Sequence, residues 1–147
     1  MLNRIDHVGL AVRDLDAAIA FYRDTFDVVA VHEEVNEEQG VREAMLAVGD
    51  SGSCIQLLAP LRDDSPIGKF LQRNGEGIQQ VAYTVDDVAA VSATLRGRGV
   101  RLLYDEPRRG TAGSLVNFVH PKDAMGVLVE LVQPGTDPGH EAEVTGQ

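Results

Sequence analysis

The chain has 147 residues, of which 44% are apolar and 24% are charged, ordinary values for one folded domain. This excludes a wholly disordered chain, a collagen-like repeat and a disulfide-stapled miniprotein, and the formal net charge of −10 argues against nucleic-acid or anionic-membrane binding. No apolar run approaches the roughly 20 residues that span a bilayer, no secretory segment opens the sequence, and a single cysteine cannot form an internal disulfide, so we expect a soluble cytoplasmic protein.

The first half of the chain begins with a β-prone run at residues 5–12, which leads into a helix. Asp14 suits the N-cap, because its carboxylate can accept from free N–H groups of the first helical turn. One helical face then collects apolar side chains, namely Leu15, Ala18, Ile19, Tyr22 and Phe26. Three further strands are expected at residues 30–36, 41–47 and 53–60.

A linker at about residues 61–76 contains a short helical stretch from Ile67 to Leu71. The second half then follows the order of the first. A β-prone run begins at Ile78, and Asp87 caps a helix that ends at Gly97 and Gly99. The remaining strands of this half are predicted at residues 101–105, 115–120 and 127–134.

The two halves form an internal repeat. The segment around Gln80 matches the segment around His7 at an offset of 73 residues, and the segment around Glu130 matches that around Gln56 at an offset of 74. We therefore predict an α+β fold of two tandem βαβββ modules, at about 3–60 and about 77–134, in a single domain spanning 1–134. A flexible tail follows at 135–147, since it has almost no apolar content.

Each module has one helix, which covers only one face of its sheet. The other face must be covered or must enclose something. Two modules side by side can bend into an open, cup-shaped sheet, and the inner face of such a cup is a natural small-molecule site.

Four polar residues stand inside otherwise apolar strands, at positions that the repeat relates in pairs: His7 with Gln80, and Gln56 with Glu130. All four can donate a lone pair to a cation, and a bound divalent metal would offset the cost of burying the Glu130 carboxylate. A single residue of this kind is more often a hydrogen-bonded core or surface residue. The pattern alone leaves metal binding and this simpler interpretation about equally open.

Glu43 shares a strand face with Val41 and Met45, and the offset of 74 makes Asn117 its repeat partner. If that face holds a metal, both side chains would point at its ligand, although spacing alone favours a solvated Glu43. Basic residues lie in loops near the second half, at Arg108, Arg109 and Lys122. Spacing alone favours ordinary surface charge for them.

The other motifs of the sequence give weaker indications of function. Cys54 has no paired histidine motif and is expected to pack in a strand. No nucleophile elbow or phosphate loop is present, and three histidines lack a ligand-like partner at regular spacing: His32, His120 and His140.

Several runs carry a family resemblance: the segments at 5–8 and 36–43, Leu102-Leu103-Tyr104-Asp105-Glu106-Pro107, and Asn117-Phe118-Val119-His120-Pro121-Lys122. From about residue 3 to 134 the chain resembles the vicinal-oxygen-chelate superfamily, which pairs βαβββ units around a metal. Within that superfamily it is similar to the methylmalonyl-CoA epimerases.

The resemblance implies a divalent metal ion held by His7, Gln56, Gln80 and Glu130, with Glu43 and Glu130 as the catalytic carboxylates. It also implies methylmalonyl-CoA as substrate and a homodimer. The family more often has His where this chain has Gln80, which leaves one nitrogen and three oxygen ligands. Such a set suits Co²⁺, Mn²⁺, Ni²⁺ or Mg²⁺ better than tetrahedral Zn²⁺, and we expect Co²⁺.

The residues that contact the substrate are inferred less directly than the metal ligands. Repeat symmetry places Asn117 within hydrogen-bonding reach of the substrate near Glu43. The phosphates of coenzyme A are expected at the mouth of the cup, near Arg108, Arg109 or Lys122.

Three alternatives remain on the same fold. A glyoxalase-type isomerase is disfavoured because Glu is expected where this chain has Gln56. An extradiol dioxygenase needs two histidines and one carboxylate, and His7 is the only histidine among the four candidates. A non-catalytic small-molecule-binding protein needs no metal ligands, so metal content would discriminate it.

Overall fold

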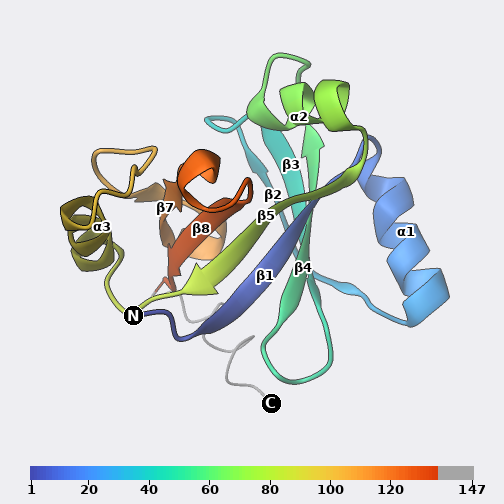
Figure 1. Cartoon of the computed structure of the whole chain (residues 1–147). Coiled ribbons are helices and arrows are strands. Elements are labelled where there is room, and N and C mark those ends of the chain that lie inside the picture. The colour runs from blue at the N-terminus through green and yellow to red at the C-terminus, as the bar shows by residue number, and fades with distance from the viewer. Residues whose placement is uncertain (136–147) are drawn as a thin grey trace. The chain divides into compact units, whose positions relative to one another are not determined.

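The computed structural model describes residues 1–135, so the predicted flexible tail lies outside the described residues except for Gly135. Figure 1 shows the elements in chain order. The strands are β1 (Arg4–Ala11), β2 (Ala30–Asn36), β3 (Val41–Ala47), β4 (Cys54–Pro60), β5 (Gly77–Thr84), β6 (Arg108–Arg109), β7 (Leu115–Val119) and β8 (Leu128–Gln133). The helices are α1 (Leu15–Phe26), α2 (Pro66–Asn74) and α3 (Val88–Gly97).

The chain divides into two compact units. The first unit is His7–Gln79, and the second unit is Met1–Asp6 together with the chain from Gln80 onward. Each unit carries one β-helix-β-β-β sequence, which confirms the predicted α+β class and its tandem modules.

The first unit orders its strands β2-β3-β4-β1. Strand β1 runs parallel to β4, whereas β2, β3 and β4 are successively antiparallel. Helix α1 packs on β3 and β4, with Leu15 buried against Ala44, Leu46 and Leu57. The predicted cap is confirmed, because Ala17 N–H donates to Asp14 Oδ1 at 3.0 Å.

One apolar residue of α1 was misplaced by the sequence pattern. Phe26 is 57% exposed, and its ring packs on the rings of Phe21 and Tyr22 instead of the core. The reason is its position, since α1 ends at Phe26 and the chain then turns through Asp27 at φ 57°. The other four predicted positions of the stripe do contact the core.

The opposite face of the first unit is covered by α2, within the predicted linker. Ile67 and Leu71 of α2 pack on Val41 and Leu58 of the sheet. The predicted helical stretch is confirmed and is longer than expected, since Ser65 caps it by accepting from Gly68 N–H at 3.1 Å.

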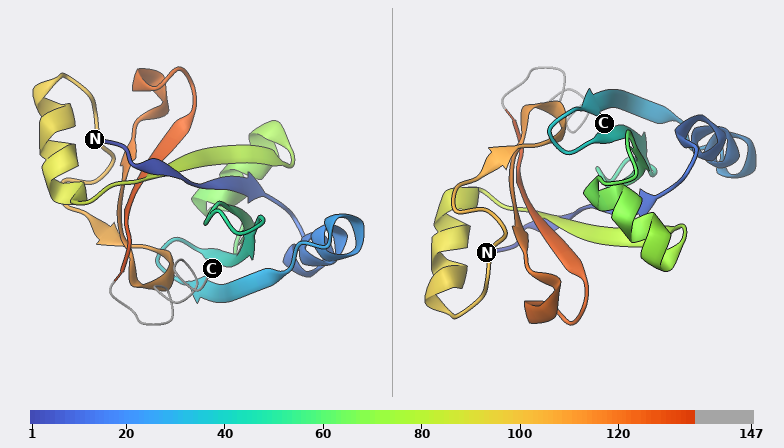
Figure 2. Two further views of the ribbon diagram at one scale, coloured as in Figure 1. Left: turned by 90° about the horizontal axis from the view of Figure 1, so that it is seen from below. Right: turned by 90° about the horizontal axis from the view of Figure 1, so that it is seen from above.

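The second unit orders its strands β5-β8-β7-β6, with β5 parallel to β8. Helix α3 lies along β7 and β8, as Figure 2 shows, and it begins at the predicted cap, where Ala90 N–H donates to Asp87 Oδ1 at 3.0 Å. Val85, Val88 and Leu131 are buried in the core between α3 and the sheet.

The predicted strand at 101–105 is wrong. That segment makes one isolated bridge, Leu102 to Val119, and the edge of the sheet is instead the two-residue strand β6. The physical reason is a buried amide: the Asn117 side chain bonds both the N–H and the carbonyl of Tyr104. The Tyr104 backbone is thereby satisfied without a strand partner, whereas the Leu103 N–H and the Arg101 carbonyl bond the backbone of Phe118 and His120.

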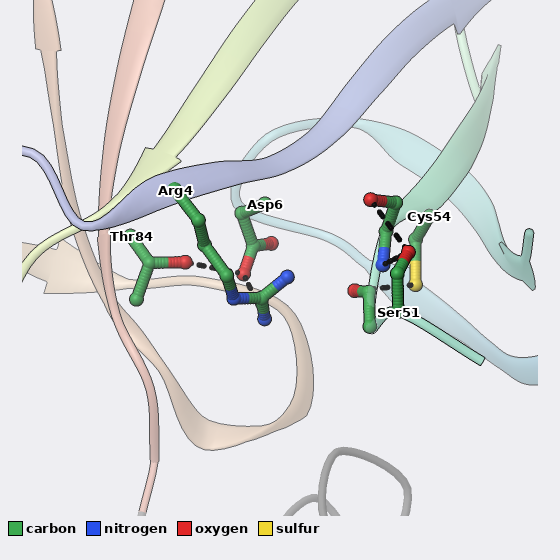
Figure 3. Close-up of polar contacts among 7 residues, drawn as sticks. Arg4, Asp6, Ser51, Cys54 and Thr84 are labelled. Carbon is green, nitrogen blue, oxygen red and sulfur yellow. Dashed lines mark hydrogen bonds and ion pairs between the residues drawn. The ribbon is translucent and has the colours of Figure 1, made fainter. Parts of the chain in front are cut away.

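The first six residues of the chain belong to the second unit. Asn3 N–H donates to the Thr84 carbonyl at 2.8 Å. The buried Asp6 carboxylate accepts from the Thr84 hydroxyl at 2.9 Å and from the Arg4 guanidinium at 3.5 Å (Figure 3). Strand β1 therefore starts in the second unit and continues in the first.

Among residues 1–135, no helix has the length and apolar character needed to cross a membrane.

Candidate active site

The first unit buries three of the predicted site residues on one face of its sheet. His7 of β1, Gln56 of β4 and Glu43 of β3 are 3%, 3% and 4% exposed. Gln56 Nε2 donates to Glu43 Oε2 at 3.0 Å, which orients the carboxylate. This face is the one that α2 covers further along, and α1 covers the other.

The second unit buries the other two. Gln80 of β5 and Glu130 of β8 are 6% and 7% exposed, and Gln80 Nε2 donates to Glu130 Oε1 at 3.0 Å. In register, Ala82 pairs with Glu130, and Ala82 packs with Val116 and Val132 on the face opposite α3.

The strand registers confirm the predicted repeat at these positions. In the first unit His7 pairs with Cys54, two residues before Gln56. In the second unit Gln80 pairs with Leu128, two residues before Glu130. Each unit therefore places its two candidate ligands on adjacent parallel strands with the same diagonal spacing.

The predicted pairing of Glu43 with Asn117 is wrong. Glu43 lies opposite Leu58, and the repeat equivalent of Leu58 is Val132, which lies opposite Val116. Val116 is thus the equivalent of Glu43. The offset is 73 residues in this strand and 74 in the next, and a one-residue difference reverses the face of a strand.

Asn117 consequently points toward α3, away from the face that carries Glu130. It is fully buried, and its Oδ1 accepts from the N–H groups of Tyr104 and Phe118 at 3.1 and 2.8 Å. Its Nδ2 donates to the Tyr104 carbonyl and the Ser92 hydroxyl at 3.0 and 3.2 Å. All four hydrogen-bonding positions of the amide are occupied, so the predicted substrate contact of Asn117 is withdrawn.

Asn117 instead anchors an aromatic platform. The Tyr104 ring packs edge-to-face on Phe118, with centroids 5.8 Å apart, and the Arg108 guanidinium lies 4.0 Å above the Tyr104 centroid. This contact holds one exposed cation in a defined place. Sequence analysis missed Tyr104, although it stands in the Leu102–Pro107 run that carried the resemblance.

The other predicted basic residues are less constrained. Arg109 is exposed on β6, opposite Leu115, and Lys122 is exposed in a short turn. Nearby, the Arg101 guanidinium hydrogen-bonds Asp123 at 2.9 and 3.0 Å and lowers the pKa of that carboxyl to about 2. This pair ties the segment after α3 to the turn at residues 121–123.

The predicted ligands are chemically suited to a divalent metal ion. The first unit supplies an imidazole nitrogen and an amide oxygen, and the second unit supplies an amide oxygen and a carboxylate. A buried carboxylate is costly without a compensating cation, and a neutral amide N–H only partly offsets its charge. Among the described residues no three His, Cys, Asp or Glu side chains cluster as a metal site. The predicted set has only His7 and Glu130 of those types.

Comparison with known proteins places the chain in a family. The sequence profile of the Glyoxalase/Bleomycin resistance protein/Dioxygenase superfamily matches residues 6–118. The chain belongs to this superfamily, which confirms the resemblance found in the sequence.

Its relatives include enzymes of known type. The crystal structure of methylmalonyl-CoA epimerase from Mycobacterium tuberculosis is 55% identical and superposes with a TM-score of 0.89, covering 91% of this chain and 89% of that one. A variant of Streptomyces coelicolor methylmalonyl-CoA epimerase, in complex with 2-nitronate-propionyl-CoA, is 53% identical with a TM-score of 0.89, covering 92% and 99%. The ethylmalonyl-CoA/methylmalonyl-CoA epimerase of Cereibacter sphaeroides is 39% identical over 90% of this chain and 99% of its own length.

Proposed function

We propose that this chain interconverts (R)- and (S)-methylmalonyl-CoA by removing the α-proton from one face of the substrate and returning a proton to the other. The observation that carries this proposal is the set of buried polar groups on the faces opposite α1 and α3, held by Gln–Glu hydrogen bonds in each unit. Similarity to methylmalonyl-CoA epimerases over nearly the whole chain supports the substrate.

The resident cofactor in this proposal is one divalent metal ion bound by His7, Gln56, Gln80 and Glu130. A set rich in oxygen donors favours Co²⁺, with Mn²⁺, Ni²⁺ and Mg²⁺ as close competitors and Zn²⁺ less suited. When bound, such an ion lowers the cost of the negative charge that develops on the thioester oxygen as the α-proton leaves. Either glutamine can present its amide oxygen to a cation, because the group carries both a donor and an acceptor.

Glu43 is the proposed base on one face of the substrate. Its carboxylate is buried and oriented by Gln56, so little rearrangement is needed when the proton arrives. Inversion requires a second acid on the opposite face, and we assign it to Glu130, acting through the oxygen that does not ligate the metal.

The coenzyme A portion is assigned to the second unit. The first unit carries six basic and thirteen acidic residues, whereas the second unit carries seven basic and ten acidic residues. Repulsion of an anionic substrate is therefore weaker over the second unit. Arg108, held on the Tyr104 ring, is the leading candidate for a phosphate contact, with Arg109 and Lys122 in supporting positions.

Family resemblance also leads us to propose a homodimer, which light scattering coupled to gel filtration would test directly.

The first test is exchange of the substrate α-proton in D₂O, followed by NMR with and without a chelator. Fast exchange that the chelator abolishes and Co²⁺ restores is the expected result. Absence of exchange with every added metal would overturn the proposal and favour a binding protein of the same superfamily.

A further inference from the structure

The sheet face of the second unit that carries Glu130 also carries an aromatic ring. Phe118 of β7 lies directly opposite Glu130 of β8, its neighbour in Figure 1. Directly opposed residues of an antiparallel pair project from the same face of the sheet. Phe118 packs on Ala82, Val116 and Val132 of this face and remains half-buried. Part of its side chain is therefore exposed on the face of the proposed acid.

A second ring extends this surface. Tyr104 lies outside the strands, and its ring packs edge-to-face on Phe118 with centroids 5.8 Å apart. The Tyr104 backbone is held from two directions, by the Asn117 amide and by the guanidinium of Arg96 on α3. A ring on a backbone fixed in this way loses little conformational freedom when a ligand binds to it.

The two rings lead to a cation that the strand register places on the same face. Arg108 of β6 lies directly opposite Val116, a member of the apolar cluster on which Phe118 packs. The Arg108 guanidinium lies 4.0 Å from the centroid of the Tyr104 ring. The cation therefore continues the aromatic surface on the face that carries Glu130.

The order of groups along this face fits the chemistry of one kind of ligand. It runs from the Glu130 carboxylate past Phe118 and Tyr104 to the Arg108 guanidinium. A coenzyme A thioester has a reacting acyl group at one end, phosphates at the other, and an uncharged arm with two amides between them. Aromatic rings suit such an arm, because they offer it a large apolar contact area.

We propose that the aromatic platform of Phe118 and Tyr104 binds the arm of the acyl-coenzyme A substrate. Phe118 contacts the part of the arm next to the thioester, and Tyr104 contacts the part nearer to the phosphates. The inference rests on the proposed function, because that function assigns the acyl group to the face of Glu130 and the phosphates to Arg108.

The test uses three thioesters of methylmalonic acid: the coenzyme A ester, the pantetheine ester, which has the arm without phosphates, and the S-ethyl ester, which has neither. Wild type is compared with Phe118→Leu and Tyr104→Leu. We expect kcat/KM to fall roughly 10-fold for the first two esters, the size of an ordinary aromatic binding contact. The S-ethyl ester should react at the wild-type rate.

The second unit offers a matched control for the loss of a tyrosine ring. Tyr83 is half-buried and lies opposite Leu131, which belongs to the core under α3 on the other face of the sheet. Tyr83→Leu should leave the ratio of kcat/KM between the three esters unchanged. An equal change of this ratio in Tyr83→Leu and Tyr104→Leu would overturn the assignment of Tyr104.

One further variant separates a ring contact from other roles of Tyr104. Tyr104→Phe keeps the ring and removes the hydroxyl, so its kcat/KM should match wild type with all three esters. A loss as large as that in Tyr104→Leu would overturn the ring contact. An equal loss with the S-ethyl ester in the leucine variants would also overturn the platform, because that ester has no arm. If Phe118→Leu does not fold, Tyr104→Leu carries the test, since Tyr104 lies outside the strands.

Failure of the platform is distinguishable from failure of the proposed function. Isothermal titration with coenzyme A and with pantetheine measures binding without turnover. If wild type binds both more tightly than Phe118→Leu yet epimerises none of the esters, the platform stands and the proposed reaction is wrong. If wild type epimerises the coenzyme A ester and both leucine variants match it in rate and in titration, only the platform is wrong. Absence of both binding and turnover in wild type overturns both.

Discussion

The two units share a strand order and a pair of diagonal site residues, yet they differ in the strand that follows their helix. In the first unit this strand is β2, seven residues long, with a bulge that points His32 and Glu34 toward the face of Glu43. In the second unit it is reduced to β6, two residues long, preceded by a loop that Asn117 holds. The same place in the repeat thus carries a hydrogen-bonded His32–Glu34 pair in one copy and exposed cations in the other.

The two units also differ on the sheet face that lies opposite α1 and α3. Glu43 in the first unit corresponds to Val116 in the second, so only the first unit carries a carboxylate at this position.

The largest effect should come from Glu130→Ala, which removes the carboxylate of the second unit. We expect loss of bound metal together with a fall in kcat of roughly 10²–10⁴-fold, because the proposed function assigns this side chain the roles of both ligand and acid. Metal content by elemental analysis and turnover are the measurements, with the exposed Glu106→Ala as control. Stoichiometric metal in Glu130→Ala would contradict the ligand assignment.

Glu43→Gln replaces the proposed base of the first unit and leaves all four proposed metal ligands in the sequence, although it changes the hydrogen-bond partner of Gln56. Turnover should fall by roughly 10²–10³-fold while metal and substrate still bind, since the amide keeps the shape and loses the basicity. Isothermal titration and initial rates measure the two properties separately. Near-normal activity would remove Glu43 from the mechanism.

Asn117→Ala tests the anchor of the second unit. Truncation removes the acceptor of the Tyr104 and Phe118 N–H groups and one of the donors to the Tyr104 carbonyl, which keeps its bond from the Arg96 guanidinium. The expected cost is about 2–4 kcal/mol in the free energy of unfolding. Urea denaturation measures this cost, and the exposed amide of Asn74 gives a matched Asn→Ala control. A change within about 0.5 kcal/mol, typical of surface substitutions, would show that the loop does not depend on Asn117.

Arg108→Ala probes the cation above Tyr104. We expect KM for methylmalonyl-CoA to rise about 10-fold with kcat little changed, because a charge-assisted phosphate contact contributes on the order of 1.5 kcal/mol. The effect should shrink as salt is added. An equal rise in KM in Arg98→Ala, which changes an exposed arginine of the same unit, would show that the effect comes from net charge and not from a specific contact.

The smallest effect concerns the Arg101–Asp123 pair. The pKa of Asp123 in the folded protein is about 2, below the ordinary value of 3.8. The stabilisation from the pair is therefore present above about pH 3.8 and is lost as the pH falls toward 2. The difference in melting temperature between wild type and Asp123→Asn should therefore be constant from pH 7 to 5 and shrink below pH 4. A difference that grows on acidification would reverse the assignment.

Sequence periodicity predicted most elements because apolar alternation and helix capping are local. Asp14 and Asp87 cap their helices as expected, and strands β2 and β3 match their predicted bounds. The strand predicted at 101–105 failed because the side chain of Asn117, in a later strand, satisfies the backbone of Tyr104. No local pattern encodes such a contact.

The repeat predicted the pairing of His7 with Gln80 and of Gln56 with Glu130, which the strand registers reproduce. It misplaced Asn117 because one residue of slippage between copies exchanges the two faces of a strand. The bulge in β2 escaped prediction for a related reason. An extra residue leaves the sequence of the strand unremarkable while inverting the direction of His32 and Glu34.

The attachment of the first six residues to the second unit has a consequence for the order of folding. Asn3 and Asp6 bond Thr84 and Asp86, some 80 positions later in the chain. On the ribosome, the beginning of β1 must wait, unpaired, until β5 has emerged. Contacts of such long range slow folding, so we expect the sheet containing Glu130 to complete late. A fusion at the amino end would then disturb the half of the molecule encoded last.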